Sequence, residues 1–176
     1  MIAAVLPTLE LSDIRLRPWR SDDASSLHRA MQDPDTVRWM AIELPYTLDD
    51  AERFIAGTDE AWARRNAAHL AIVDREDDLV GYIGVLSVEE AMRVVEIGYW
   101  VAPESRGRGV ASQALQGVVE WIRDELSPDR IELGMLAGND ASRRVAEKAG
   151  FQLDRTEESG KLLDGDPVDE WIFLLP

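Results

Sequence analysis

The feature that most constrains this chain is a strand that runs into a glycine-rich turn and then into a long amphipathic helix. The strand is predicted at 94–101, the turn is Arg106-Gly-Arg-Gly109, and the helical spacing of apolar residues continues to Leu126. The two glycines accept unusual dihedrals and let several N–H groups face one point, beside the positive end of the helix dipole. The two arginines add formal charge. The segment therefore predicts a pyrophosphate site, although a tight strand-to-helix connection without a ligand has the same pattern.

Two other phosphate-binding motifs are excluded by sequence. The chain has no Gly-x-x-x-x-Gly-Lys-Ser/Thr stretch, so it is not a P-loop nucleotide hydrolase. Gly107-x-Gly109 lacks the third glycine of a dinucleotide-binding fingerprint, because residue 112 is serine.

Hydrophobic periodicity along the chain predicts an α+β domain with a mixed sheet, in the order β-α-α-β-β-β-α-β-α-β-β. One domain is expected over residues 1–176, with 1–11 as an N-terminal arm or an early edge strand. Ser21 and Thr47 are expected to cap the first two helices, and Asp33-Pro34 to break the first. The strands are expected near 14–18, 69–74, 79–86, 94–101, 131–136, 151–158 and 167–175, and the helices near 21–31, 47–65, 110–126 and 139–150.

Composition narrows the range of partners. The chain has 34 acidic and 19 basic residues, for a net charge of −15. Such a surface repels nucleic acid and anionic membranes and attracts cationic ligands such as amines, unless the acidity serves solubility alone. The absence of cysteine excludes disulfides, thiolate metal sites and an acyl-cysteine intermediate. No apolar run approaches the ~20 residues of a membrane span, so the simplest location is the cytoplasm.

Three segments together resemble a known family. Arg106-Gly-Arg-Gly-Val-Ala111 matches the Gln/Arg-x-x-Gly-x-Gly/Ala pattern of the GNAT superfamily of N-acetyltransferases, and the preceding Glu96-Ile-Gly-Tyr-Trp-Val is similar to the RimJ/RimL-type branch. Asn139-Asp-Ala-Ser…Glu-Lys-Ala-Gly-Phe151 resembles the second cofactor motif, and Leu162-Leu-Asp-Gly…Asp169 resembles the closing hairpin. The resemblance covers about 15–175. It implies a GNAT fold with a mostly antiparallel sheet, acetyl-CoA as co-substrate without a metal, direct acetyl transfer to an amine, and a chain able to form a homodimer.

The resemblance also implies which residues hold acetyl-CoA. They are backbone amides at the end of the 94–101 strand, the glycine-rich turn, and side chains of the helix that begins at Asn139. Asn139 is equally well interpreted as a helix N-cap, and Arg143 as a further candidate for the 3′-phosphate. The implied set is Trp100, Val101, Arg106, Gly107, Arg108, Gly109, Val110, Ala111, Asn139, Ser142, Arg144 and Lys148.

Two residues are the catalytic candidates under the same resemblance. Glu96 is expected to act as general base through water, or else to be an exposed strand residue paired with Arg93. Ser142 is expected to protonate the leaving thiolate or to orient the thioester. Many GNAT enzymes have a tyrosine at the position of Ala146, and its absence here leaves this role to the Ser142 hydroxyl. The expected acceptor pocket comprises Trp39, Tyr46, Trp62 and Asp169, with Asp169 as a weaker alternative base.

Three functions remain open at this point. The first is acetylation of the N-terminal α-amine of a protein or peptide, and the second is acetylation of a small amine such as an aminoglycoside, a polyamine or an amino-sugar. The third is a non-catalytic acyl-CoA-binding regulatory module, because a fold does not fix a substrate. His28 and His69 have no metal-like spacing and are expected to be structural.

Overall fold

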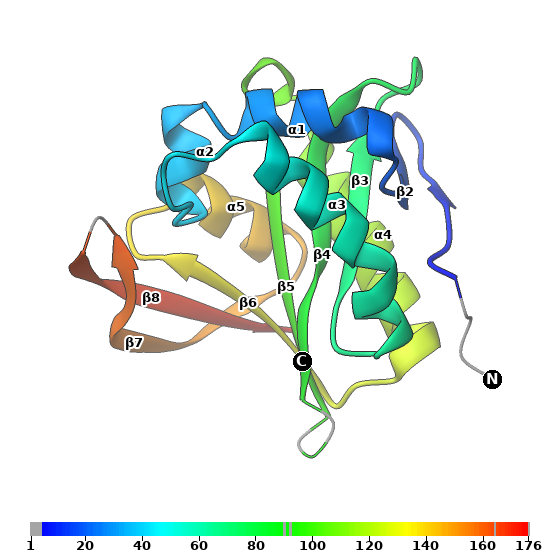
Figure 1. The fold of residues 1–176 in the computed structure, drawn as a ribbon. Coiled ribbons are helices and arrows are strands. Elements are labelled where there is room, and N and C mark those ends of the chain that lie inside the picture. Colours follow the sequence, from blue (N-terminus) through cyan, green and yellow to red (C-terminus); the bar gives the residue numbers. More distant parts are fainter. Residues whose placement is uncertain (1–4, 90, 92, 164, 176) are drawn as a thin grey trace.

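The computed structural model describes residues 5–89, 91, 93–163 and 165–175 (Figure 1). Two short 3-10 turns are also present: Ser21–Asp23 directly precedes the first helix, and Pro103–Ser105 directly precedes the glycine-rich turn. The strands and helices are β1 (Leu9–Glu10), β2 (Arg15–Pro18), α1 (Ala24–Ala30), α2 (Pro34–Trp39), α3 (Leu48–Ala63), β3 (Ala68–Val73), β4 (Leu79–Glu89), β5 (Val94–Val101), α4 (Val110–Leu126), β6 (Arg130–Leu136), α5 (Asp140–Lys148), β7 (Gln152–Leu163) and β8 (Asp166–Leu175).

All strands join one sheet in the order β1-β2-β3-β4-β5-β6-β8-β7. Every neighbouring pair is antiparallel except β5 and β6, which are parallel. Helices α1, α2 and α3 lie over one face, and α4 and α5 lie behind the other (Figure 1). The predicted α+β fold with a mixed, mostly antiparallel sheet is therefore confirmed.

Two short elements go beyond the predicted order. Leu9–Glu10 forms β1 at the sheet edge, one of the two outcomes expected for the N-terminal arm. Helix α2 was not predicted, because Asp33-Pro34 was interpreted only as a break. The Asp33 carboxylate accepts a hydrogen bond from the Thr36 N–H at 2.8 Å, and Pro34 occupies the first helical position, so the same two residues start a new helix.

The helix caps follow the prediction at Thr47 and depart from it at Ser21. Thr47 and Asp50 form a reciprocal capping box at the start of α3. Ser21 is instead the first residue of a 3-10 turn, and Asp23 accepts the backbone N–H of Arg20 at 2.8 Å. Asp164 of the predicted closing hairpin lies outside the described residues.

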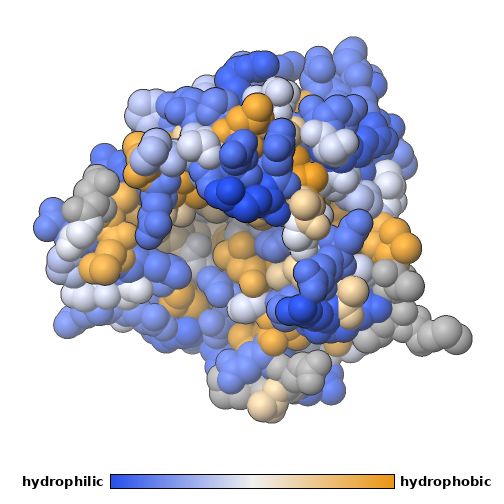
Figure 2. Space-filling model, viewed as in Figure 1, coloured by the Kyte–Doolittle hydropathy of each residue, from blue (hydrophilic) through white to orange (hydrophobic). Residues whose placement is uncertain are grey.

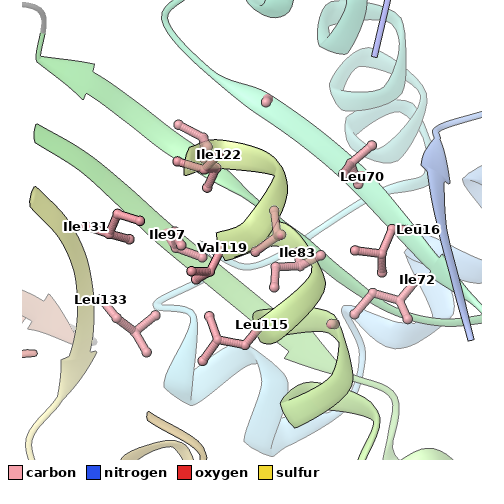
Figure 3. Close-up of a cluster of buried hydrophobic side chains, with 14 of the residues drawn as sticks. Leu16, Leu70, Ile72, Ile83, Ile97, Leu115, Val119, Ile122, Ile131 and Leu133 are labelled. Atoms are coloured by element: carbon pink, nitrogen blue, oxygen red, sulfur yellow. The ribbon is translucent and has the colours of Figure 1, made fainter. Parts of the chain in front are cut away.

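Strand alternation divides the core between the two faces of the sheet. Leu70, Ile72 and Ile83 point toward α4, where they meet Leu115 and other apolar residues of its inner face (Figure 3). Their strand neighbours Ala71, Val73 and Tyr82 point to the opposite face and pack under α1 and α3. Helix α4 is thus fixed against the strand that leads into it, with its N-terminus at one end of β5.

A buried ion pair joins the first long strand to α1. The Arg17 guanidinium donates to both carboxylate oxygens of Asp23, at 2.8 and 2.9 Å, and both side chains are buried. Asp77 accepts from Arg15, Arg17 and Arg20, and these hydrogen bonds, that of Arg15 foremost, lower the pKa of its carboxyl to about 2. Within the described ranges, no helix has the length and hydropathy needed to cross a membrane.

Candidate active site

A cavity of about 770 Å³ lies where β5 and β6 diverge. The two strands pair from Val94 with Arg130 to Ile97 with Leu133, and no further pairing between them is found in the described chain. Residues of α2, β5, the glycine-rich turn, β6, α5 and the β7–β8 hairpin line the space that opens beyond this point. Figure 2 shows the surface hollowed below α2 and beside the hairpin. The volume falls in the range of pockets that bury small molecules and cofactors.

The splay leaves backbone groups of β5 without a strand partner on the cavity side. The Ala102 N–H donates to the Val80 carbonyl of β4 at 2.9 Å. Because an antiparallel strand alternates its hydrogen-bonding side, the backbone groups of Val101 and Tyr99 face away from β4 and toward the cavity. The Val101 carbonyl accepts from Arg106 Nε at 3.1 Å, which leaves the Val101 N–H facing the space. Trp100 has the opposite backbone orientation, and its indole stacks on Tyr82 with ring centroids 6.5 Å apart.

The glycine-rich turn has the backbone that its sequence predicts. Gly107 and Gly109 adopt φ values of 72° and 81°, and no other heavy atom lies within 4 Å of where a Cβ would stand on either residue. The turn therefore presents open backbone next to the N-terminus of α4, which begins at Val110. This combination of N–H groups and helix dipole suits an anion such as a pyrophosphate.

The two arginines of the turn have different surroundings, and only Arg106 lines the cavity. The Arg106 guanidinium turns toward α2, where it pairs with Asp33 and Asp35 and donates to Thr36 Oγ1 at 3.0 Å. It therefore ties α2 to the turn. Burial alone would raise the pKa of the Asp33 carboxyl, but the hydrogen bonds from Arg106 and Thr36 outweigh this effect and lower it. Arg108 is exposed and does not belong to the cavity lining.

Further cationic charge reaches the cavity from α5. Arg144 and Lys148 are one helical turn apart and both line the cavity, and neither forms an ion pair within the part of the chain that the structure describes. Arg143, by contrast, pairs with Glu147 at 2.8 Å. In a protein with almost twice as many acidic as basic residues, two cations facing one cavity indicate an anionic ligand. Asn139 serves as the N-cap of this helix, as one of its two interpretations predicted, and it also lines the cavity.

Ser142 has a partner that sequence reasoning missed. Its Oγ lies 2.7 Å from the Tyr99 hydroxyl, which comes from β5, and both residues line the cavity. Burial raises the pKa of Tyr99 to about 12, with the Ser142 hydrogen bond acting in the opposite direction. A tyrosine hydroxyl is thus present beside Ser142 even though position 146 is a buried alanine. The only sequence signal for Tyr99 is its position on β5, two residues before Val101, because alternate residues of a strand face the same side.

Three acidic residues line the cavity, and one of them, Asp35, pairs with Arg106. Of the other two, Glu96 and Glu170, only Glu96 was predicted. Glu96 is half-buried, lines the cavity and accepts from Ser87 Oγ at 3.3 Å. Its alternative interpretation as a partner of Arg93 is wrong, because Arg93 pairs with Asp129 at 3.2 Å. The second carboxylate is Glu170, which is buried and lines the cavity.

The predicted hairpin candidate was Asp169, one residue before Glu170. Asp169 accepts the Ser159 N–H at 3.0 Å and lies outside the cavity lining. A shift of one residue along a strand moves a side chain to the other face, which is why Glu170 reaches the cavity and Asp169 does not. Burial raises the pKa of Glu170, and Lys161 lowers it in part while Glu96 raises it further.

The predicted acceptor pocket is corrected in two places. Trp39 lines the cavity. Trp62 does not, because it is 2% exposed in the core and packs on Trp121 with ring centroids 5.4 Å apart. Tyr46 packs beside the core under α1 and α3, also outside the cavity lining. His69 is structural as expected, since its Nδ1 lies 2.8 Å from the Tyr82 hydroxyl.

No group of three or more His, Cys, Asp or Glu side chains suited to a metal ion is found among the described residues. The carboxylates of Glu96 and Glu170 fit an amine, and the cations of α5 with the open backbone of the turn fit a phosphate-bearing acyl donor. The Val101 N–H, the turn at Gly107 and Gly109, and the side chains of Arg144 and Lys148 are the groups that fit acetyl-CoA.

Comparison with known proteins agrees with this geometry. Residues 13–152 match the acetyltransferase (GNAT) domain, so the chain belongs to the GNAT family and is an N-acetyltransferase of that type, a class that uses acetyl-CoA. It is similar to the uncharacterised N-acetyltransferase YoaA of Bacillus subtilis, with 25% identity over 172 residues and 97% of each chain covered. It is also similar to a ribosomal-protein-serine acetyltransferase of Escherichia coli, with 29% identity over 107 residues, covering 61% of this chain and 59% of the relative.

A solved structure of the ribosomal L7/L12 α-N-protein acetyltransferase RimL in complex with coenzyme A shares the fold. The TM-score is 0.85 at 20% sequence identity, and the match covers 96% of this chain and 97% of the other. The GNAT resemblance predicted from the motifs is confirmed by the family match, and the ribosomal-protein-serine acetyltransferase relative supports a RimJ/RimL-like type.

Proposed function

We propose that this N-acetyltransferase transfers the acetyl group of acetyl-CoA to the N-terminal α-amine of a protein or peptide. The observation that carries the proposal is one cavity whose lining includes Arg144, Lys148 and the open backbone of the glycine-rich turn together with the carboxylates of Glu96 and Glu170. Its similarity to a ribosomal-protein-serine acetyltransferase supports a protein acceptor. The net charge of −15 favours approach of a cationic chain end.

The carboxylate base itself favours an α-amine over a lysine side chain. An α-ammonium has a pKa of about 8 and a lysine ammonium one of about 10.4. The lysine must therefore give up its proton at an extra cost of roughly 3 kcal/mol before it can attack. Glu96 faces the cavity and would accept the proton through water, as a general base must lie within reach of the amine or of one bridging water.

The acetyl thioester supplies an activated carbonyl, and the chain holds it in place for attack. The Val101 N–H faces the cavity and would bind the pantetheine arm, while the turn at Gly107 and Gly109 would bind the pyrophosphate. Arg144 and Lys148 would bind the 3′-phosphate. Fixing one reactant beside the other accounts for a large part of such a rate enhancement.

At the leaving group, Ser142 and Tyr99 would act as hydrogen-bond donors and not as acids. A thiolate with a pKa of about 8.5 is a much weaker base than the phenolate of a tyrosine whose pKa is about 12. Complete proton transfer from the Tyr99–Ser142 pair is therefore unfavourable, whereas a hydrogen bond to the sulfur stabilises the developing charge. Of the two roles expected for Ser142, orientation of the thioester is the one that this pair supports.

The proposal is tested by measuring CoA release with a panel of amines. The panel contains peptides that begin with Ser, Ala or Met, the same peptides with a blocked N-terminus and an internal lysine, a polyamine and an aminoglycoside. We expect release with the free N-terminal peptides and none with the blocked ones. Release with the polyamine or the aminoglycoside alone would overturn the proposed acceptor. No release with any amine, despite CoA binding, would favour a binding module.

A further inference from the structure

The carboxylates of Glu96 and Glu170 converge on one point above Gly134. A Cβ at Gly134 would stand 2.6 Å from Glu170 Oε1 and 3.4 Å from Glu96 Oε1, so only glycine leaves both carboxylates their positions. Both carboxylates line the cavity. Two like charges placed together, one of them buried, repel each other unless a cation lies between or beside them.

That cation is already present as the side chain of Lys161. Its Nζ lies 3.6 Å from Glu170 Oε1, and Lys161 also lines the cavity. The lysine side chain remains 48% exposed, whereas the Glu170 side chain is only 8% exposed. A primary ammonium on a flexible, half-exposed chain thus lies against a buried carboxylate, and it can leave at low cost.

An irregularity in β7 puts Lys161 in this position. The register of β7 against β8 shifts between Glu157, opposite Glu170, and Lys161, opposite Val168. Within the shift, Ser159 adopts a φ of 55° and donates its N–H to the neighbouring strand. Bulges of this kind redirect side chains and are frequent beside active sites. The hairpin is therefore shaped to bring one lysine to the buried carboxylate.

We propose that Glu96 and Glu170 form the subsite that binds the protonated amine of the acceptor, and that Lys161 occupies this subsite until the acceptor ammonium displaces it. The inference rests on the proposed function and gives its acceptor side a chemical definition. The Lys161 ammonium beside Glu170 shows which kind of group this carboxylate accommodates. It also acts as an internal competitor, so the site selects acceptors that are cationic and excludes neutral ones.

The first test observes Lys161 directly and needs no catalysis. The chain has only two lysines, Lys148 and Lys161, so protein labelled with 13C-lysine gives two side-chain signals from the carbons next to Nζ. The CoA-bound protein is titrated with a peptide that begins with Ser and, as control, with its N-acetylated form. We expect a saturable shift of the Lys161 signal with the free peptide only. An unmoved Lys161 signal, or equal shifts with both peptides, would overturn the proposal whether or not acetyl transfer is detected.

The second test uses opposite changes in KM for the same peptide, at mildly alkaline pH and saturating acetyl-CoA. Lys161→Met removes the competitor and should lower KM about two- to fivefold, while Lys161→Arg should resemble the wild type. Glu170→Gln should raise KM at least about tenfold, because a charged hydrogen bond to the ammonium is lost. Asp166→Asn removes the same charge from the same strand outside the cavity lining and should change nothing.

If Lys161 competes with the acceptor, Lys161→Met lowers KM, and if Lys161 binds the acceptor, the same variant raises KM. A raised KM in Lys161→Met would mean that Lys161 binds the acceptor, and a Glu170→Gln variant equal to Asp166→Asn would mean that Glu170 does not. Either result overturns the subsite. If the wild type acetylates no amine at all, the proposed function fails, and the lysine titration alone decides whether the carboxylates bind an ammonium.

Discussion

Gly109 offers a perturbation whose effects on stability and on binding can be separated. It has a φ of 81°, a left-handed conformation that costs an L-residue about 1–2 kcal/mol. A Cβ there would meet no other heavy atom within 4 Å, so no clash adds to this cost. Gly109→Ala should therefore lower the free energy of unfolding by about 1–2 kcal/mol, and the protein should still fold.

The same substitution should weaken CoA binding by more than the backbone cost. The new methyl group enters the open space beside the turn, from which a pyrophosphate would receive backbone N–H groups. Loss of one hydrogen bond to a charged oxygen costs about 1.5–3 kcal/mol, so the Kd for CoA should rise roughly tenfold to 150-fold. Isothermal titration calorimetry gives this Kd, and urea denaturation gives the unfolding free energy.

Gly165→Ala is the matched control for this experiment. Gly165 has a φ of 85° and equally open surroundings, but it lies in the β7–β8 turn outside the cavity lining. Both variants should lose similar stability, and only Gly109→Ala should lose affinity. Equal Kd values for CoA in the two variants would refute the assignment of the pyrophosphate site to the 106–109 turn.

Three further predictions concern the core, the charges and the leaving group. Leu115 is fully buried under the sheet, so Leu115→Ala should cost about 2.7–5 kcal/mol of unfolding free energy, and a loss below about 1 kcal/mol would contradict its core position. The pKa of Asp77 is lowered to about 2, so its stabilisation is complete above its ordinary pKa of 3.8 and is lost as the pH falls through about 2. Wild-type unfolding free energy should therefore fall between these pH values more steeply than that of Asp77→Asn, and parallel curves would exclude the effect. Tyr99→Phe should lower kcat about fivefold with an unchanged Kd for CoA, because the hydrogen bond to Ser142 is lost, and an unchanged kcat would remove Tyr99 from the reaction.

Local signals in the sequence predicted the elements that carry the proposed cofactor-binding side of the cavity. The strand at 94–101 and the helix at 110–126 were predicted at their observed bounds, because alternation, glycine dihedrals and helical spacing are all properties of neighbouring residues. The N-cap at Asn139 is local in the same sense. Likewise, positions four apart on one helix put Arg144 and Lys148 on one face.

The residues that the sequence did not reveal depend on contacts between distant segments. Arg106 was predicted as a cofactor ligand and lines the cavity, but the pairing of its guanidinium with Asp33 and Asp35, more than seventy positions earlier, was not predicted. Trp62 resembled a pocket residue, but its side of α3 faces the core. Such pairings depend on how the helices pack on the sheet, which the local pattern does not specify.

The acceptor side was harder to predict because it depends on strand register. Asp169 and Glu170 are neighbours on β8, so their side chains point to opposite faces of the sheet, and only the strand register decides which one reaches the cavity. The register shift in β7 has no short-range sequence signal beyond Ser159-Gly160. The partnership of Tyr99 with Ser142 likewise joins a strand to a helix that lies 43 positions later. Strand register and long-range packing therefore position the proposed catalytic groups, whereas local backbone chemistry shapes the turn proposed to bind the cofactor.

Tandem mass spectrometry of one doubly reactive peptide tests the central claim most directly. A peptide that begins with a free serine and carries one internal lysine is incubated with acetyl-CoA and the protein, and the position of any added acetyl group is read from the fragment ions. The account predicts one acetyl group on the N-terminal α-amine, at a rate that Gly109→Ala and Glu96→Gln both reduce. Acetylation of the lysine alone, or an unmodified peptide after CoA binding has been verified, would contradict it.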